Sequence, residues 1–182
     1  MGINEGRPRL LNNAVLGAIG FVLSAYSVHV ERMVEHRNLD DDMDEFVALC
    51  DIESIGARCS AVFSLPEGKM LSFFGLVPRG HVLDVPNGVL GMLFYAYTII
   101  RYFIVGKTTS REHRGIVALF GSNTVILVIS SLALASSVFL GMKLYRIREL
   151  CVVCVSTHII NTTLWIRAMM EFGNIRSKAK ND

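Results

Sequence analysis

The chain has 182 residues, enough for one domain; 52% of them are hydrophobic and only 19% are charged. The net charge of +2 is too small to favour a nucleic-acid-binding protein, and no basic stretch with interleaved aromatic residues occurs. The apolar residues are grouped in blocks of about 20, a length that spans the roughly 30 Å hydrocarbon core of a bilayer as a helix. Composition therefore predicts a membrane protein in contact with the lipid bilayer.

Four apolar blocks predict four transmembrane helices. They cover residues of about 10–30, 88–105, 115–142 and 150–171. The first block is longer than the apolar core of a secretory signal, and no cleavage motif of small residues follows it. The predicted fold class is therefore an all-α membrane protein, a bundle of four transmembrane helices that forms a single domain over residues 1–182.

Charged residues within these blocks are expected near the membrane surface. Arg101 lies late in the second block, where a long cationic side chain can extend along the helix to reach the headgroups. Arg167 and Glu171 are spaced i, i+4 at the end of the fourth block. That spacing favours an ion pair on one face of a helix.

The distribution of basic residues predicts the orientation of the bundle. With four spans, both termini lie on one side, together with the connection between the second and third spans. Each of these segments is basic: Arg7 and Arg9; Lys107, Arg111 and Arg114; Arg176, Lys178 and Lys180. Because basic loops stay in the cytosol, both termini are predicted to be cytosolic and the long loop at about 31–87 to face the other side. The short connection at 142–150 also faces that side although it is basic.

All four cysteines fall on the non-cytosolic side of this topology. Cys50 and Cys59 lie in the long loop, and Cys151 and Cys154 form a Cys-x-x-Cys motif at the start of the fourth span. That side of a secretory or bacterial membrane is oxidising, so disulfides persist there. A helix N-terminus concentrates unpaired amide groups and partial positive charge, which favours a thiolate over a thiol. The motif therefore predicts an activated dithiol at the membrane edge.

The two cysteines of the motif are expected to have different tasks. Cys154 lies about 4.5 Å deeper in the bilayer than Cys151, from the rise of a helix, and is placed to meet a lipophilic substrate. Cys151 is placed to exchange with another protein sulfur, and Cys50 and Cys59 can carry reducing equivalents to it from a soluble partner. Two structural disulfides are the alternative. No metal is predicted, because the C-x8-C spacing lacks the short pair that zinc sites usually have.

The motifs around these cysteines resemble those of the vitamin K epoxide reductase family, and the similar segments are spread over most of the chain. They read LSAYSVHVER at the end of the first span, ALCD and RCSAVFS around the loop cysteines, FGLV later in the loop, PNGVLGMLFY at the start of the second span and CVVCVSTHIIN at the start of the fourth. The resemblance implies a four-helix bundle around a quinone pocket in the endoplasmic reticulum membrane.

The activity that this resemblance implies is of the warfarin-sensitive type. Vitamin K 2,3-epoxide is reduced to the quinone, and the quinone to the hydroquinone, with two electrons each. The hydroquinone would support γ-carboxylation of glutamate, so functional coupling to γ-glutamyl carboxylase is implied. No permanently bound cofactor is implied, because redox-active disulfides carry the electrons from lumenal thioredoxin-like oxidoreductases.

The resemblance also implies a role for each site residue. Electrons pass from the partner to the substrate through Cys50, Cys59, Cys151 and Cys154, in that order, and Cys151 exchanges with Cys59. Asn87, which opens the second span, hydrogen-bonds a substrate oxygen. Phe63, in the loop, lines the pocket.

The chain departs from the family pattern at several positions. The family has a tyrosine four residues after the second cysteine of the motif, where this chain has His158. Histidine can also donate a hydrogen bond to a carbonyl or epoxide oxygen, so His158 is predicted to bind the substrate. The loop cysteines are one residue further apart, and the loop reads SLPEGKMLSFFG where relatives have a tryptophan and arginines. The amphipathic stretch at 61–77 is expected to lie on the membrane surface as a differently built lid over the pocket.

Two other functions stay open from the sequence. The same electron path run backwards would make a quinone-linked oxidoreductase that forms disulfides in other proteins, because the reduction potentials of substrate and partner set the direction. A non-enzymatic four-span membrane protein would use its cysteines only to brace the lumenal loop. That hypothesis predicts two stable disulfides and leaves the Asn87 motif unexplained.

Overall fold

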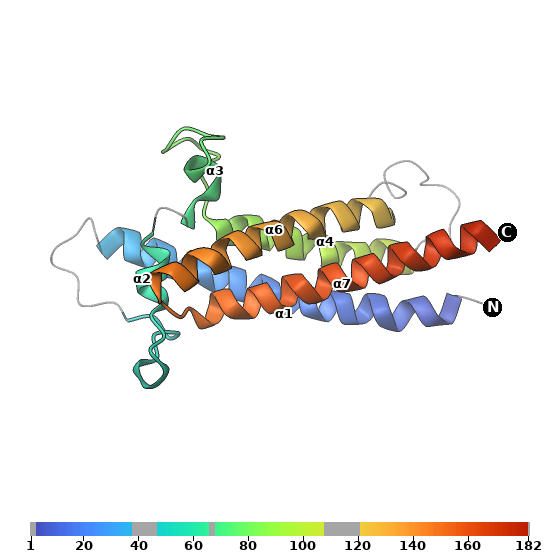
Figure 1. Cartoon of the computed structure of the whole chain (residues 1–182), viewed down its shortest axis with the longest axis horizontal. Helices are drawn as coiled ribbons and strands as arrows, with labels where there is room; N and C mark the ends of the chain where they lie inside the picture. Colours follow the sequence, from blue (N-terminus) through green and yellow to red (C-terminus); the bar gives the residue numbers. More distant parts are fainter. Residues whose placement is uncertain (1–2, 38–46, 66–67, 108–120, 182) are drawn as a thin grey trace.

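Four long helices form the body of the molecule. The computed structural model describes residues 3–37, 47–65, 68–107 and 121–181. The long helices run side by side along its long axis: α1 (Ile3–Arg37), α4 (Asn87–Lys107), α6 (Asn123–Ile147) and α7 (Val152–Asn181) (Figure 1). Three short elements lie toward the end opposite the two termini: η1 (Glu53–Ile55), α2 (Cys59–Phe63) and α3 (Met70–Phe73) (Figure 1). The described residues contain no strand, so the all-α prediction is confirmed.

Two of the long helices are long and apolar enough to cross a membrane. They cover Leu10–Glu35 and Asn123–Ile147, and only 33% and 17% of their most apolar windows are buried in the protein. Such low burial is unlike that of a core helix in a water-soluble protein, which hides its apolar face. Over the described residues, α4 and α7 do not meet the same test of length and apolarity. The four-span arrangement therefore stays a prediction.

The helices do not end where the apolar blocks end. α1 continues to Arg37, beyond the predicted end at 30. The expected loop at 142–150 is largely wrong, because α6 continues through Ile147 and only 148–151 connect it to α7. The reason is packing: Leu144 and Ile147 line the main cavity of the bundle. Arg148 then takes a left-handed conformation, with φ of 56°, that ends the helix.

Part of the predicted third span, at 115–120, and the acidic run at 40–45 lie outside the described residues.

Small residues let α1 and α4 approach closely. A Cβ atom added at Gly88 of α4 would lie 2.9 Å from the Ser24 carbonyl oxygen, and one added at Gly17 of α1 would lie 3.2 Å from the Tyr95 carbonyl oxygen. Both distances are too short for an ordinary contact, so larger side chains would push the helices apart. The close approach fixes how α1 and α4 form one wall of the bundle.

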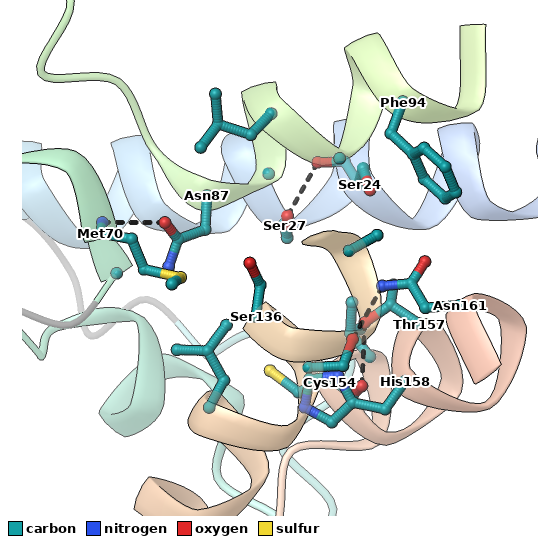
Figure 2. A pocket seen from close by; sticks show the side chains of 18 of the residues that line it. Ser24, Ser27, Met70, Asn87, Phe94, Ser136, Cys154, Thr157, His158 and Asn161 are labelled. Carbon is teal, nitrogen blue, oxygen red and sulfur yellow. Dashed lines mark hydrogen bonds between the residues drawn. The ribbon is translucent and has the colours of Figure 1, made fainter. Parts of the chain in front are cut away.

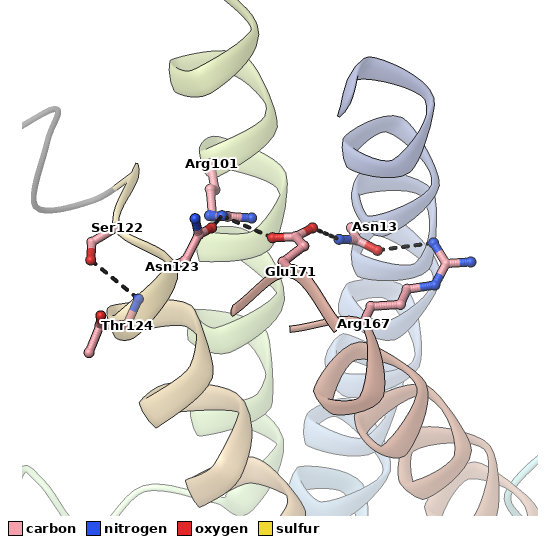
Figure 3. Close-up of polar contacts among 7 residues, drawn as sticks. All are labelled: Asn13, Arg101, Ser122, Asn123, Thr124, Arg167 and Glu171. Carbon is pink, nitrogen blue, oxygen red and sulfur yellow. Dashed lines mark hydrogen bonds and ion pairs between the residues drawn. The ribbon is translucent and has the colours of Figure 1, made fainter. Parts of the chain in front are cut away.

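A polar cluster ties all four long helices together near the termini (Figure 3). Arg101 of α4 is only 5% exposed and forms an ion pair with Glu171 of α7 at 3.2 Å. It also donates a hydrogen bond to Asn123 of α6. Asn13 of α1 donates to Glu171 at 3.4 Å and accepts from Arg167 at 3.0 Å. We call these five residues the polar lock.

The polar lock corrects two expectations about the charged residues in the helices. Arg101 does not extend to the surface, because Glu171 and Asn123 provide partners for its guanidinium inside the bundle. Arg167 and Glu171 do not pair with each other: Glu171 turns toward Arg101, and Arg167 turns toward Asn13. An i, i+4 spacing permits a pair, but partners on neighbouring helices compete for the same groups.

Candidate active site

The four cysteines meet at one end of the bundle, but in two different states. Cys50 and Cys59 form a disulfide, whereas Cys151 and Cys154 are free thiols. Cys59 and Cys151 are both 0% exposed, and with Cys50 they belong to one buried cluster with Val30 of α1. Cys154 packs against the same cluster. Residues that are about 100 positions apart in the chain are therefore brought together in one redox centre.

The Cys-x-x-Cys motif lies at the start of α7, as the sequence predicts. Cys151 immediately precedes the first helical residue, and its carbonyl oxygen accepts the hydrogen bond from the Val155 amide at 2.9 Å. Its Sγ atom accepts a hydrogen bond from the Cys154 amide at 3.3 Å. The sulfur thus takes the place of a capping oxygen at a helix N-terminus, where donated amides and the helix dipole favour negative charge.

The segment that carries Cys50 is folded around Asp51. The Asp51 carboxylate accepts hydrogen bonds from the Ala48 amide at 3.1 Å and the Ser60 amide at 3.0 Å. Burial by itself would raise the pKa of this carboxyl, but hydrogen bonds from Ser60, Ala48 and Cys59 outweigh it and hold the pKa below its ordinary value. The ionised carboxylate therefore joins the two flanks of the disulfide.

Among the described residues, the Asp51 carboxylate lies beside the loop sulfurs where it could complete a metal-ligand set. Its oxygen and the sulfurs of Cys50 and Cys59 lie within 4.8 Å of one another. Zinc, however, is bound by thiolates, and the two sulfurs are joined in a disulfide. This arrangement favours thiol–disulfide chemistry over a metal centre.

An apolar cavity of about 570 Å³ opens beside Cys154. Figure 2 shows Asn87 of α4 on one side of it and Cys154 and His158 of α7 on the facing side. Phe63 of α2 also lines the cavity. The structure therefore brings together Cys154, Asn87, His158 and Phe63, as the sequence analysis expects, while the fully buried Cys151 packs behind Cys154.

The short helix α3 lies beside this cavity, which its first residue Met70 lines, and it contacts the bundle at two places. The Met70 amide at its start donates to Asn87 Oδ1 at 2.9 Å. Phe73 and Phe74 pack against Phe139 of α6, with ring centroids 5.9 and 5.0 Å apart. The Lys143 ammonium lies 5.0 Å from the Phe73 ring centroid, a cation–π distance. These contacts hold α3 against α4 and α6, and a lid function for the 61–77 segment stays a prediction.

His158 is polar without being satisfied inside the protein. Both ring nitrogens are buried, and neither has a hydrogen-bond partner among the described residues. Such a state costs free energy unless a ligand completes it. His158 lies one helical turn after Cys154 and lines the same cavity, so its imidazole can bond to an oxygen of a molecule held against the Cys154 sulfur.

A second set of polar groups in the cavity wall was not predicted from the sequence. The Tyr95 hydroxyl donates to Asn161 Oδ1 at 2.8 Å, and Asn161 Nδ2 donates to the Ser137 hydroxyl at 2.8 Å. This chain joins α4, α7 and α6. The sequence does show that Tyr95 and Asn161 are polar residues inside apolar blocks. It does not show that these two residues face each other.

The cavity reaches the outer surface between α4 and α6. Leu90 and Leu93 of α4 and Leu132 of α6 all line it, and their exposed fractions are 36%, 65% and 64%. The opening is therefore apolar and faces sideways from the bundle axis. A ligand with a long apolar tail could place its head beside Cys154 and its tail through this opening.

Comparisons with known proteins agree on the family of this chain. Residues 12–169 match the model of the vitamin K epoxide reductase family. The chain is 30% identical over 184 aligned positions to vitamin K epoxide reductase complex subunit 1 of Mus musculus, covering 98% of this chain and 99% of the mouse protein. It is 29% identical to the protein of the same name from Rattus norvegicus, covering 92% and 91% of the two chains.

Proposed function

The chain belongs to the vitamin K epoxide reductase family and is an oxidoreductase, and we propose that it reduces vitamin K 2,3-epoxide to the quinone and the quinone to the hydroquinone. One observation carries this proposal. The Cys154 thiol lines an apolar cavity opposite Asn87, and Cys151 packs behind it against the loop disulfide. A lipophilic quinone and a dithiol reductant can therefore meet in one place.

The proposed chemistry uses the two thiols of α7. The Cys154 thiolate attacks a ring carbon of the bound epoxide, and the opened oxygen takes up a proton. Cys151 then attacks the Cys154 sulfur, so that the Cys151–Cys154 disulfide forms and the bond between that sulfur and the ring carbon breaks. The released electron pair forms the ring double bond of the quinone, and the hydroxyl leaves with a second proton as water. The epoxide gains two electrons and the two thiols lose them. A second reduced pair adds two electrons and two protons to the quinone in the same way.

Polar side chains around the cavity orient the head of the substrate. His158 is proposed to donate a hydrogen bond to one substrate oxygen, which would satisfy a ring that is otherwise unpaired among the described residues. Asn87 is proposed to donate through Nδ2 to a second oxygen, while its Oδ1 holds the lid through Met70. The Asn87 side chain would thus contact both the substrate and the first residue of α3.

The apolar tail of vitamin K fits the sideways opening between α4 and α6. All four long helices carry exposed apolar residues on their outer faces, including Val22, Leu93, Leu132 and Ile159. Exposed apolar surface on every long helix supports a bundle that spans a bilayer four times. We place it in the endoplasmic reticulum membrane, with both termini cytosolic and the cysteines lumenal, and with functional coupling to γ-glutamyl carboxylase.

Electrons are proposed to reach α7 through the loop cysteines. Cys50 would accept them from a lumenal thioredoxin-like oxidoreductase, and Cys59 would pass them to Cys151. The burial of Cys59 and Cys151 in one cluster supports this order, because exchange needs two sulfurs in contact.

The two rival functions differ in how well they fit. Bracing by two structural disulfides leaves the apolar cavity beside Cys154, with Asn87 on its facing side, without a role. A disulfide-forming enzyme would use the same sulfurs with electrons flowing outward to the quinone. The direction depends on reduction potentials rather than on geometry, so it must be measured.

The deciding experiment uses the full chain in microsomes with vitamin K epoxide and dithiothreitol, with quinone and hydroquinone as products. The wild type should form both, and Cys154→Ala should form neither. Ser156→Ala, two residues further along α7, is the matched control and should keep the activity. A folded wild type that forms no product would overturn the reductase proposal, and oxidation of a test protein with added quinone would then favour the disulfide-forming alternative.

A further inference from the structure

The segment that carries Cys59 is joined to the segment that carries Cys151 by contacts outside the sulfurs. The Arg58 guanidinium forms an ion pair with the Glu149 carboxylate at 3.0 Å. The Arg58 amide donates to the Leu150 carbonyl oxygen at 2.9 Å, and Ala57 and Leu150 form a parallel bridge. Arg58 immediately precedes Cys59, and Leu150 immediately precedes Cys151. The two segments therefore run side by side into the cluster of cysteines.

The ion pair lies on the outside of this junction, and the sulfurs lie inside it. The Arg58 and Glu149 side chains are 67% and 22% exposed, whereas Cys59 and Cys151 are 0% exposed. The backbone bridge fixes the position of the two segments relative to each other, and the ion pair joins their side chains on the solvent-facing side. This arrangement limits how far Cys59 can move away from Cys151 when the loop disulfide opens.

We propose that Arg58 and Glu149 are positioning residues that hold Cys59 within reach of Cys151 during electron transfer. The proposal rests on the relay in the proposed function and adds a structural device to it. Neither residue lines the cavity beside Cys154. Their effect would be to raise the effective concentration of one cysteine at the other.

The step that this device serves balances as a two-electron exchange. The Cys59 thiolate attacks the Cys151 sulfur of the oxidised α7 pair, a Cys59–Cys151 bond forms, and Cys154 leaves as a thiolate that takes up a proton. The Cys50 thiolate then attacks Cys59 and releases Cys151. The α7 pair is reduced, the loop pair is oxidised, and a lumenal dithiol protein reduces the loop pair again.

The expected effect is modest, because a largely exposed ion pair contributes little. Removal of such a pair changes an equilibrium by up to about fivefold, and charge reversal also adds repulsion between like charges. The effect should shrink at high salt, since exposed charges are screened beyond about 3 Å at 1 M ionic strength. A contribution from packing alone would not depend on salt in this way.

The test measures the Cys59–Cys151 bond itself, in the full chain carrying Cys50→Ala and Cys154→Ala, in microsomes equilibrated with glutathione buffers. We expect Arg58→Glu to lower the equilibrium constant for this disulfide about fivefold. The double reversal Arg58→Glu with Glu149→Arg should restore it. Arg146→Glu, an equal charge change at an exposed position near the end of α6, is the control and should leave it unaltered.

The results separate this proposal from the proposed function. Failure of the double reversal to restore the bond, or an equal loss in Arg146→Glu, would overturn the positioning role. The measurement contains no quinone, so it decides that role even if the wild type were found not to reduce vitamin K epoxide. A loss in Arg58→Glu that disappears at 1 M salt would support the electrostatic contact directly.

Discussion

Near the termini, Glu171 is paired with Arg101 and Asn13 inside the bundle, and of the Arg101 guanidinium only Nε is buried without a partner among the described residues. Near the opposite end, both ring nitrogens of His158 are buried without a partner there. Both regions place polar groups among apolar helices, but only the second surrounds a cavity of about 570 Å³. Polar groups that pair with each other fix helices in place, while groups that point into a cavity are arranged for a ligand. The difference marks the first region as structural and the second as the candidate functional site.

The largest expected effect is loss of chemistry at the functional end. Cys154→Ser replaces the sulfur with a hydroxyl that is a far weaker nucleophile near neutral pH, so epoxide reduction should fall at least about a thousandfold. Stability should change little, because the two side chains are similar in size. Product formation and thermal unfolding of the same preparation would measure both, and substantial activity in Cys154→Ser would contradict the assignment of the nucleophile.

The opposite result is expected at the polar lock. Glu171→Leu leaves the Arg101 guanidinium buried without its carboxylate, which should lower the free energy of unfolding by about 3 kcal/mol. Activity per folded molecule should be retained, because the lock lies far from Cys154 along α7. Adding Arg101→Met should recover most of the stability, as both charges are then removed. A Glu171→Leu protein as stable as the wild type would show that the ion pair contributes nothing.

Substitution of His158 should lower the activity without lowering the stability. His158→Phe removes the proposed hydrogen bond to the substrate, so kcat/KM should fall about tenfold, while stability should stay equal or rise by up to about 1 kcal/mol. The rise is expected because no buried nitrogen is then left unpaired. His158→Tyr keeps a donor and should recover part of the activity. If His158→Phe kept full activity, the imidazole would not contact the substrate.

Tyr95 tests whether the cavity wall behaves like the polar lock. Tyr95→Phe removes the bond to Asn161 and should cost about 1 kcal/mol of stability. A smaller change in KM is expected because Asn161 and Ser137 keep their own bond. Thermal unfolding and substrate titration would measure the two effects. If the change in KM, expressed as a free energy, exceeded the loss in the free energy of unfolding, Tyr95 would act mainly on substrate binding.

The smallest expected effect concerns the loop around the disulfide. The pKa of Asp51 is lower in the folded protein than in the unfolded chain, so its stabilisation is present above the ordinary value of about 4. That stabilisation is lost as the pH falls through the lowered pKa. Exchange of the Ala48 and Ser60 amides should therefore speed up relative to other loop amides on acidification. In Asp51→Asn this pH dependence should be absent.

How far the sequence predicts each region depends on whether the signal is local. The Cys-x-x-Cys motif at the start of α7 was predictable, because capping and helix dipole act within one turn. The helical class followed from apolar blocks of suitable length. The end of α6 was not predictable, because Leu144 and Ile147 stay helical to line a cavity whose other walls come from distant segments.

The amino-acid sequence by itself determined the helical class, the position of the Cys-x-x-Cys motif and the motifs that identify the family. Only the tertiary structure decided which polar groups are paired. It turned Glu171 from Arg167 toward Arg101, joined Tyr95 to Asn161, and set Arg58 beside Glu149. The physical reason is that hydrogen bonds and ion pairs act over a few ångströms in space, and the partners of a side chain are known only when the helices have been packed together.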